Sequence, residues 1–471
     1  MEHGRGRVLH HRAASWRRTA RTLGVVLAVS VMAVLGPWLS TAHAPPGSPD
    51  VVIFLTDDQR SDSLGAMPYL RSEVLGRGVS FPEAMVPTSL CCPSRATILT
   101  GRFAHDTGVW GNHMPWGSWR RFHEQGNEDD TLAVALDEFG YETVLLGKYM
   151  NGYKSTTTDE YPPPGWDRFE SFEVPGHTGA YYGFQLRGSP RRYGPREYST
   201  DVLAQRADQI IRRTPGDTPL FLYIAPYAPH GKYIPPRRYA ALEPVTPTAS
   251  DRLVEDRVGM PPWVRRQPPV PPETAAWMRD GQHRTLRAVD DAVERVIGSL
   301  RRSGRLRNTL FIFLSDNGLM RGEHELVGKN LPYRATTSIP MGVRWDARVP
   351  AGRVDGRIAL NVDVAATVVA ATGAPMDTGG LDLLGARTRH GFPVEAIGWG
   401  PPGRPSYCGW RTKRYLFVHY SGGVEELYDY RTDPDELANR AGDPAYRQVV
   451  DDLRARAREG CDPPPPRFTW R

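Results

Sequence analysis

The sequence predicts an α/β protein built on a large, mostly parallel sheet with helices on both faces. Two observations predict this class. Continuous apolar runs of strand length, such as VVIFL at 51–55, alternate along the chain with longer segments of helical spacing. The chain of 471 residues, with 40% apolar and 24% charged residues, is also long enough for one large domain and a smaller one.

Four apolar runs are expected to form buried parallel strands, within residues 49–59, 141–149, 219–230 and 308–318. Each run is followed by polar residues. These residues are Asp57 and Asp58, Lys148, His230, and Asp316 with Asn317. Ligands of α/β sheets bind outside the carboxyl ends of the strands, so the sequence predicts one site at this edge.

Helices are expected between these strands, at 131–140, 199–213 and 283–304, where apolar residues recur at helical spacing. Residues 232–275 are rich in Pro and Arg and predict a long surface excursion that lines the substrate entrance.

The last hundred residues differ in character from the rest of the chain. A loop-rich stretch is expected from 376 to about 405, followed by short strands at 414–420 and 425–430 and a helix at 446–460. We therefore predict a large domain at 45–375 and a small C-terminal α+β domain with a short antiparallel sheet at 376–471.

Residues 1–44 have the pattern of a secretory signal peptide: an Arg-rich start, an apolar middle and a small-x-small end at Ala42–Ala44. A membrane anchor is the alternative, although the apolar run is slightly short for a span. Without this segment the formal net charge falls from +6 to about +1. We expect a secreted or extracytoplasmic protein with no nucleic-acid partner and no stable membrane span after cleavage.

Lysine is rare in this chain, since only five of the 59 basic residues are lysines. We expect a chain that otherwise uses Arg to keep Lys where a compact, rotatable ammonium group is needed. The five positions are Lys148, Lys154, Lys232, Lys329 and Lys413.

Two of the four cysteines are adjacent, in SLCCPSRATILTG at 89–101. Adjacent cysteines rarely form a disulfide, because the two Cβ atoms must face each other at about 4 Å. The segment fits the pattern Cys-x-Pro-x-Arg followed by Leu-Thr-Gly, with Cys91 in register and Cys92 in the free position.

With this motif, the TDDQ and SDNG segments and the tail ELYDYRTDPDELANRAGDP, the chain resembles the type I sulfatases of the alkaline-phosphatase superfamily. Local segments such as LCCPSR, GKYMNGY and YIAPYAPH most resemble N-acetylglucosamine-6-sulfatase-like members. The resemblance implies an exported sulfuric ester hydrolase acting on a sulfated sugar. It also implies that a formylglycine-generating enzyme oxidises Cys91 to formylglycine (3-oxoalanine), whose hydrate attacks sulfur with one hydroxyl and releases sulfate with the other.

The resemblance also assigns roles to individual residues. One cation would be held by Asp57, Asp58, Asp316, Asn317 and the oxygen at position 91; these hard donors favour Ca²⁺, with Mg²⁺ as the alternative. Arg95 and Lys148 would orient the diol, His230 would protonate the leaving oxygen, and Lys329 would bind a sulfate oxygen. His105 would support them from a second layer.

Some alternatives stay open at this point. The same superfamily contains phosphonate monoester and phosphodiester hydrolases, and a sulfated-glycan-binding protein without catalysis is a third reading. GKYMN at 147–151 and PYRA at 332–335 depart from the usual sulfatase residues and bear on substrate choice. Cys408 and Cys461 are candidates for a disulfide outside the cytoplasm.

Overall fold

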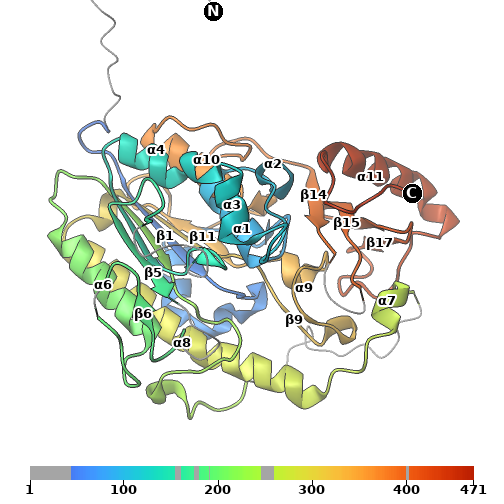
Figure 1. Ribbon diagram of the computed structural model, residues 1–471, viewed down its shortest axis with the longest axis horizontal. Coiled ribbons are helices and arrows are strands. Elements are labelled where there is room, and N and C mark those ends of the chain that lie inside the picture. The colour runs from blue at the N-terminus through green and yellow to red at the C-terminus, as the bar shows by residue number, and fades with distance from the viewer. Residues whose placement is uncertain (1–43, 154–160, 174–179, 190, 246–258, 399–402) are drawn as a thin grey trace, which may run out of the picture. The chain divides into compact units, whose positions relative to one another are not determined.

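The computed structural model describes residues 44–153, 161–173, 180–189, 191–245, 259–398 and 403–471 (Figure 1). The expected signal peptide therefore lies outside the described residues, apart from Ala44. None of the helices in these ranges is both long and apolar enough to cross a membrane.

A mixed sheet of nine strands forms the centre of the fold, in the order β12-β2-β11-β8-β1-β7-β4-β5-β6. The four strands expected from the sequence are neighbours and run parallel: β8 (Thr309–Ser315), β1 (Asp50–Thr56), β7 (Leu220–Ala225) and β4 (Glu142–Gly147). Because layers cover both faces, these strands are apolar almost throughout. The remaining strands are β12 (Arg353–Val354), β2 (Val79–Ser80), β11 (Met341–Arg344), β5 (Arg168–Glu173), which continues the parallel run beside β4, and β6 (Gln185–Leu186).

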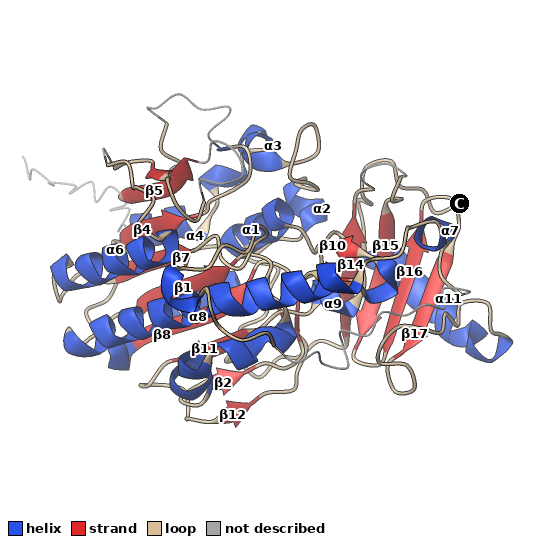
Figure 2. Cartoon of the chain, turned by 90° about the horizontal axis from the view of Figure 1, so that it is seen from below, coloured by secondary structure: helices blue, strands red, loops and turns tan. Residues whose placement is uncertain are grey.

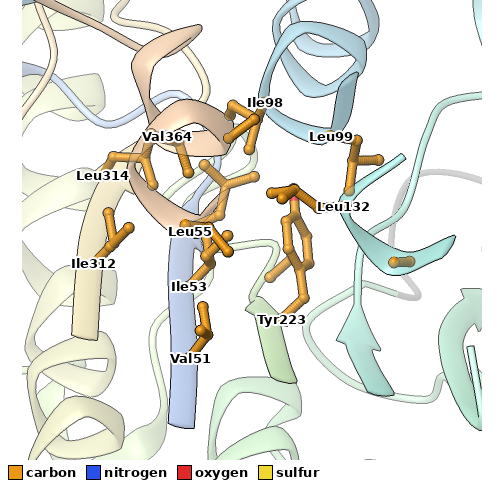
Figure 3. Packing of buried hydrophobic residues seen from close by; sticks show 14 of the residues in the cluster. Val51, Ile53, Leu55, Ile98, Leu99, Leu132, Tyr223, Ile312, Leu314 and Val364 are labelled. Atoms are coloured by element: carbon orange, nitrogen blue, oxygen red, sulfur yellow. The ribbon is translucent and has the colours of Figure 1, made fainter. Parts of the chain in front are cut away.

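Alternate residues of β1 pack against helices on opposite faces of the sheet. Val51, Ile53 and Leu55 share one core with α1 (Cys91–Thr100), α4 (Leu132–Glu138) and α10 (Asp363–Thr372), as Figure 3 shows. Val52 and Phe54 share the other core with α6 (Ser199–Arg213) and α8 (Pro272–Arg302). The predicted α/β sheet between two helical layers is confirmed.

The longest helix, α8, begins well before the expected start at residue 283. Its first residue is Pro272, inside the segment expected to form a surface excursion, and α7 (Pro262–Arg265) also lies there. Pro suits the first turn of a helix because the backbone N–H groups there have no intrahelical partner. Prolines that suggest a loop in the sequence therefore mark helix starts.

Shorter elements connect these layers. The strands among them are β3 (Ala84–Met85), β9 (Met320–Arg321), β10 (Val327–Gly328) and β13 (Ala359–Leu360), and the helices are α2 (Ala104–Thr107), α3 (Ser118–Glu124) and α9 (Arg334–Thr337). Single helical turns lie at Ser61–Ala66, Leu70–Leu75, Asn127–Asp129, Arg237–Tyr239, Leu306–Asn308, Glu323–Glu325 and Pro444–Tyr446.

A second, antiparallel sheet of four strands follows (Figure 2), in the order β14 (Gly391–Ala396), β15 (Tyr407–Thr412), β16 (Tyr415–Tyr420) and β17 (Glu425–Asp429). The β16–β17 pair matches the predicted strands, whereas β14 lies inside the stretch expected to be loop-rich. Helix α11 (Arg447–Gly460) packs on β15 and β16, and a disulfide joins Cys408 to Cys461. The division of the chain at residue 376 stays a prediction.

A buried carboxylate connects the second sheet to the first part of the chain. Glu426 of β17 accepts hydrogen bonds from the hydroxyls of Tyr333, Tyr420 and Tyr428. Burial raises the pKa of Glu426 to about 6, although these hydrogen bonds act in the opposite direction. The charged form of this group is therefore costly in the folded chain.

Candidate active site

The carboxyl ends of the central strands bring the expected polar residues together. Asp57 and Asp58 follow β1, Lys148 follows β4, and Asp316 with Asn317 follows β8. Because these strands are parallel and β7 joins β1 to β4, their ends lie at one edge of the sheet. Ligand atoms of Asp57, Asp58, Cys91 and His230 all lie within 4.8 Å of one another.

The turn after β1 presents two consecutive carboxylates to this cluster. Asp58 has a φ of 64°, in the left-handed region that non-glycine residues seldom adopt. Two contacts hold the turn: the backbone N–H of Asp58 donates to Oδ1 of Asp316 at 3.0 Å, and Gln282 donates from Nε2 to the carbonyl of Asp58 at 3.1 Å. Neighbouring strands and α8 thus fix a backbone conformation that the local sequence does not favour.

The two adjacent cysteines, both free thiols, have different surroundings. Cys91 is the first residue of α1, and its Sγ lies 3.6 Å from Oδ1 of Asp57 and accepts a hydrogen bond from Nζ of Lys329 at 2.8 Å. The Sγ of Cys92 accepts from the backbone N–H of Asn151 at 3.2 Å. Cys91 therefore belongs to the cluster, whereas the Cys92 side chain packs beside it, against the backbone of Asn151.

Arg95 lies one turn after Cys91 on α1 and is fully buried. Its Nε donates to Oδ2 of Asp316 at 2.9 Å, and its Nη1 donates to the carbonyl of Lys148 at 2.8 Å. Lys148 in turn donates from Nζ to Oδ2 of Asp57 at 2.5 Å. Burial would lower the pKa of Lys148, but the charge of Asp57 outweighs it and raises that pKa.

Lys329 and His230 approach the cluster from two further loops. The ammonium of Lys329 donates to Oδ1 of Asp58 as well as to Cys91. His230 holds Nε2 at 3.5 Å from Oδ2 of Asp58. Its Nδ1 lies 2.9 Å from the carbonyl of Gly231. Since a carbonyl only accepts, Nδ1 carries the proton of that bond, and Nε2 is left to face the cluster.

The charges in the cluster are closely balanced. Burial would raise the pKa of Asp57, but Lys148 and His230 lower it to about 2. For the lysines, burial would lower the pKa, but the neighbouring acids raise it. The pKa of Lys329 is well above its usual range, chiefly because of Asp58. The pKa of the Cys91 thiol is raised to about 12 by burial, so the unmodified side chain is a protonated, weakly nucleophilic thiol at neutral pH.

The donor set fits a hard divalent cation. Three carboxylates and an amide converge without any competing sulfur apart from Cys91, and oxygen donors are those that Ca²⁺ and Mg²⁺ prefer. Asn317 is fully buried, and its Oδ1 has no hydrogen-bond partner among the described residues. A buried amide oxygen left unpaired is costly unless a ligand meets it. Asp57, Asp58, Asp316 and Asn317 are therefore suited to hold the cation.

Sequence reasoning missed residues that support this cluster from a distance. Arg404, in the loop before β15, donates from Nη1 to the carbonyl of Lys329 at 3.1 Å and from Nη2 to the carbonyl of Val327 at 3.3 Å. Glu395 of β14 was also missed; its Oε1 lies 2.9 Å from Nδ1 of His105, the residue expected from the sequence in a second layer. No signal in the sequence links Arg404 to Lys329, because the contact is made by backbone carbonyls.

The two departures from the usual sulfatase residues have separate places in the structure. In GKYMN, the Oδ1 of Asn151 lies 3.5 Å from the Sγ of Cys92, so the Asn151 side chain contacts the residue next to Cys91. In PYRA, Arg334 lines a cavity of about 600 Å³ together with Arg60 and Glu436. The residues that line this cavity are distinct from those of the cluster.

A parallel sheet with an acid-rich cluster at its carboxyl edge, beside a cysteine at a helix start, defines the class of alkaline-phosphatase-like hydrolases. The sulfatase family model matches residues 49–374, which is more than half of the chain. The chain belongs to the sulfatase family.

Curated relatives with sulfatase names cover most of this chain. Human N-acetylglucosamine-6-sulfatase is 29% identical over 371 residues, which are 75% of this chain and 65% of that protein. The extracellular sulfatase SULF-1 homolog of Drosophila melanogaster is 29% identical over 349 residues, 69% of this chain and 30% of that protein. The chain thus spans less than two thirds of the length of both relatives.

Solved structures share the fold at lower identity. One is a complex with its substrate D-glucosamine-2-N,6-O-disulfate, with a TM-score of 0.70, 20% identity and coverage of 88% of this chain and 97% of that one. Another is the phosphonate monoester hydrolase of Agrobacterium radiobacter, with a TM-score of 0.71, 22% identity and coverage of 87% and 96%. Both likenesses establish the fold.

Proposed function

We propose that the chain is an exported sulfatase that hydrolyses a sulfate monoester on a sulfated sugar similar to N-acetylglucosamine-6-sulfate. The observation that carries this proposal is the meeting of Cys91, three acids, Asn317 and two lysines at one edge of the sheet. The substrate class is supported by the names of the N-acetylglucosamine-6-sulfatase relatives. The Arg-rich, then apolar, residues 1–44 support export.

The proposal includes a modified residue and one cation. In the mature chain, a formylglycine hydrate at position 91, made by a formylglycine-generating enzyme, would supply the nucleophilic hydroxyl, and one Ca²⁺ would offset negative charge on the ester. Asp57, Asp58, Asp316 and Asn317 would hold this cation. The short distances between Cys91, Asp57 and Lys329 support position 91 as the reacting residue.

The chain's own side chains would act on charge and protons. The ammonium groups of Lys148 and Lys329 are buried beside Asp57 and Asp58 and stay charged, so they would stabilise anionic oxygens of the ester. His230 would act as the acid in its cationic form: Nδ1–H is held by the carbonyl of Gly231, and the second proton, on Nε2, would pass to the leaving oxygen. Arg95 would position Asp316 and Lys148 through its two hydrogen bonds.

Hydrolysis of a phosphonate monoester or phosphodiester is the second candidate, favoured by the structural likeness to a phosphonate monoester hydrolase. The same lysines would stabilise a phosphoryl group equally well, since both esters present anionic oxygens. A chain that binds sulfated glycans without catalysis is the third candidate, and it requires Cys91 to stay unmodified in the native host.

The test uses the chain co-expressed with a formylglycine-generating enzyme and reloaded with Ca²⁺ or Mg²⁺ after chelation. We expect kcat/KM for an aryl sulfate to exceed that for the matching aryl phosphonate monoester, with sulfated N-acetylglucosamine turned over among a panel of sulfated sugars. Faster turnover of the phosphonate would favour the second candidate. An intact thiol at position 91 in protein from the native host, seen by mass spectrometry, would favour the third.

A further inference from the structure

One aromatic ring stands out on the surface of α8. Among the described residues, five large hydrophobic side chains are exposed, and Trp277 is the one aromatic ring among them, with 56% of its surface accessible. A single exposed apolar side chain is ordinary by itself. Trp277 is of interest because Tyr233 connects it to the loops of the active-site cluster.

Tyr233 lies between Trp277 and the cluster. The two rings meet edge to face, with centroids 5.0 Å apart and an interplanar angle of 73°. Tyr233 is buried against Gly281 of α8, where a Cβ atom would come within 2.3 Å of the Cβ of Tyr233. A glycine at 281 is therefore needed for this close packing.

The other side of Tyr233 faces the active-site loops. A Cβ atom on Gly231, the residue after His230, would lie 3.8 Å from the Tyr233 hydroxyl. Tyr233 also packs with Leu319, two residues after Asn317. Burial raises the pKa of Tyr233, and the charges of Asp58 and Lys329 act on the same hydroxyl. The ring contact with Trp277 and the approach of Tyr233 to Gly231 thus place the exposed indole near the loop that carries His230.

A lysine stands next to Tyr233 in the sequence. Lys232 immediately precedes Tyr233 and is exposed. Of the chain's few lysines, Lys148 and Lys329 serve the cluster, and Lys413 lies in the turn between β15 and β16. An indole face packs well on the apolar face of a pyranose, and an ammonium group pairs with sulfate or carboxylate. The two features together match an anionic sugar ring.

We propose that Trp277 and Lys232 form an outer subsite that binds the sugar ring next to the one that carries the scissile sulfate. The substrate class that follows is an oligosaccharide or polysaccharide with a further sulfate or carboxylate on the neighbouring ring. This inference rests on the proposed sulfatase function. It adds to that function, because a sulfated monosaccharide would occupy the cluster without reaching Trp277.

The experiment compares two substrates on the mature, metal-loaded enzyme: a sulfated tetrasaccharide and a small aryl sulfate. For each variant the measured quantity is the kcat/KM for the tetrasaccharide divided by that for the aryl sulfate. We expect Trp277→Ala to lower this ratio roughly tenfold, the size of one aromatic stacking contact, and Trp277→Phe to lower it less. Lys232→Gln lowers the ratio a few-fold at low salt and less at high salt.

Matched controls are available in the described chain. Lys413→Gln removes another exposed lysine, and Val354→Ala truncates a side chain on edge strand β12 that is 70% exposed. Neither change should alter the ratio. An unchanged ratio in Trp277→Ala, or an equal fall in the control variants, overturns the outer subsite while leaving the sulfatase activity established.

A binding measurement separates failure of the subsite from failure of the proposed function. If the mature chain hydrolyses neither sulfate ester, the sulfatase proposal fails. Calorimetric binding of the sulfated tetrasaccharide to the Cys91→Ala chain then decides on the subsite. About tenfold weaker binding after adding Trp277→Ala supports it, and equal binding, or none in either chain, overturns it.

Discussion

The adjacent cysteines give the sharpest test of the candidate site, because the same change at neighbouring positions should have opposite consequences. Cys91→Ala removes the residue that would become the nucleophile. Loss of a catalytic nucleophile lowers kcat by about 10⁵-fold or more. Its cost in stability should be small, because Lys329 and Asp57 each keep another charged partner, Asp58 and Lys148 respectively.

Cys92→Ala should have the reverse effect. Cys92 is fully buried, and its Sγ is the acceptor for the backbone N–H of Asn151 at 3.2 Å. Truncation leaves that donor without its acceptor and opens a small space in the core. An unsatisfied buried donor costs about 1–3 kcal/mol, so we expect a loss of about 2 kcal/mol in the free energy of unfolding. Turnover should stay within a few-fold of wild type.

Aryl sulfate turnover and thermal unfolding of both mature variants are measured side by side, with mass spectrometry at position 91. Cys92→Ser, which keeps an acceptor for Asn151, is the control and should recover part of the lost stability. The reasoning is refuted if Cys91→Ala retains turnover, or if Cys92→Ala is the variant without formylglycine and without activity.

Three further predictions concern the second sheet and its contacts with the first part of the chain. Arg404→Ala releases the carbonyl of Lys329, so kcat/KM for an aryl sulfate should fall about tenfold with little change in melting temperature, and Arg404→Lys should recover part of it; a parallel loss of stability and activity would contradict this positioning role. Glu426 has a raised pKa of about 6, so its contribution to stability is full below about 4.5 and is lost as the pH rises through 6. The free energy of unfolding of Glu426→Gln, measured relative to wild type by denaturant titration, should therefore rise by about 2 kcal/mol from pH 4 to pH 7. A stability difference that does not depend on pH would contradict the raised pKa. Replacing both Cys408 and Cys461 by Ala opens a loop of 53 residues and should cost about 4 kcal/mol by loop entropy, measured by unfolding without reductant; an unchanged unfolding midpoint would count against it.

Much of the fold was predictable because buried parallel strands leave a strong mark on the sequence. A run such as VVIFL is apolar on both faces only where layers cover both faces, which is the environment of β1. The start of α8 was not predictable, because the prolines around 272 are compatible with both a loop and a first helical turn. Strand β14, GFPVEA, contains Gly and Pro and gives little strand signal.

For the site, the sequence named the residues but could not supply their mutual contacts. Asp57, Lys148 and Asp316 were predicted to meet because each follows a parallel strand. Lys148 donates to Asp57, and the backbone N–H of Asp58 donates to Asp316, which agrees with that argument. Arg404 and Gln282 escaped notice because they act on backbone carbonyls, which carry no residue-specific signal.

The sequence by itself determined which side chains follow the strands, which cysteine stands in the motif, and the sulfatase family to which the chain belongs. Only the tertiary structure decided which cysteine thiol lies among the acids and that Cys408 and Cys461 are joined. It alone also set Trp277 beside Tyr233 at the approach to His230. The physical reason is that residue type and local spacing are properties of the chain, whereas contacts between distant residues depend on how helices and loops pack around the sheet.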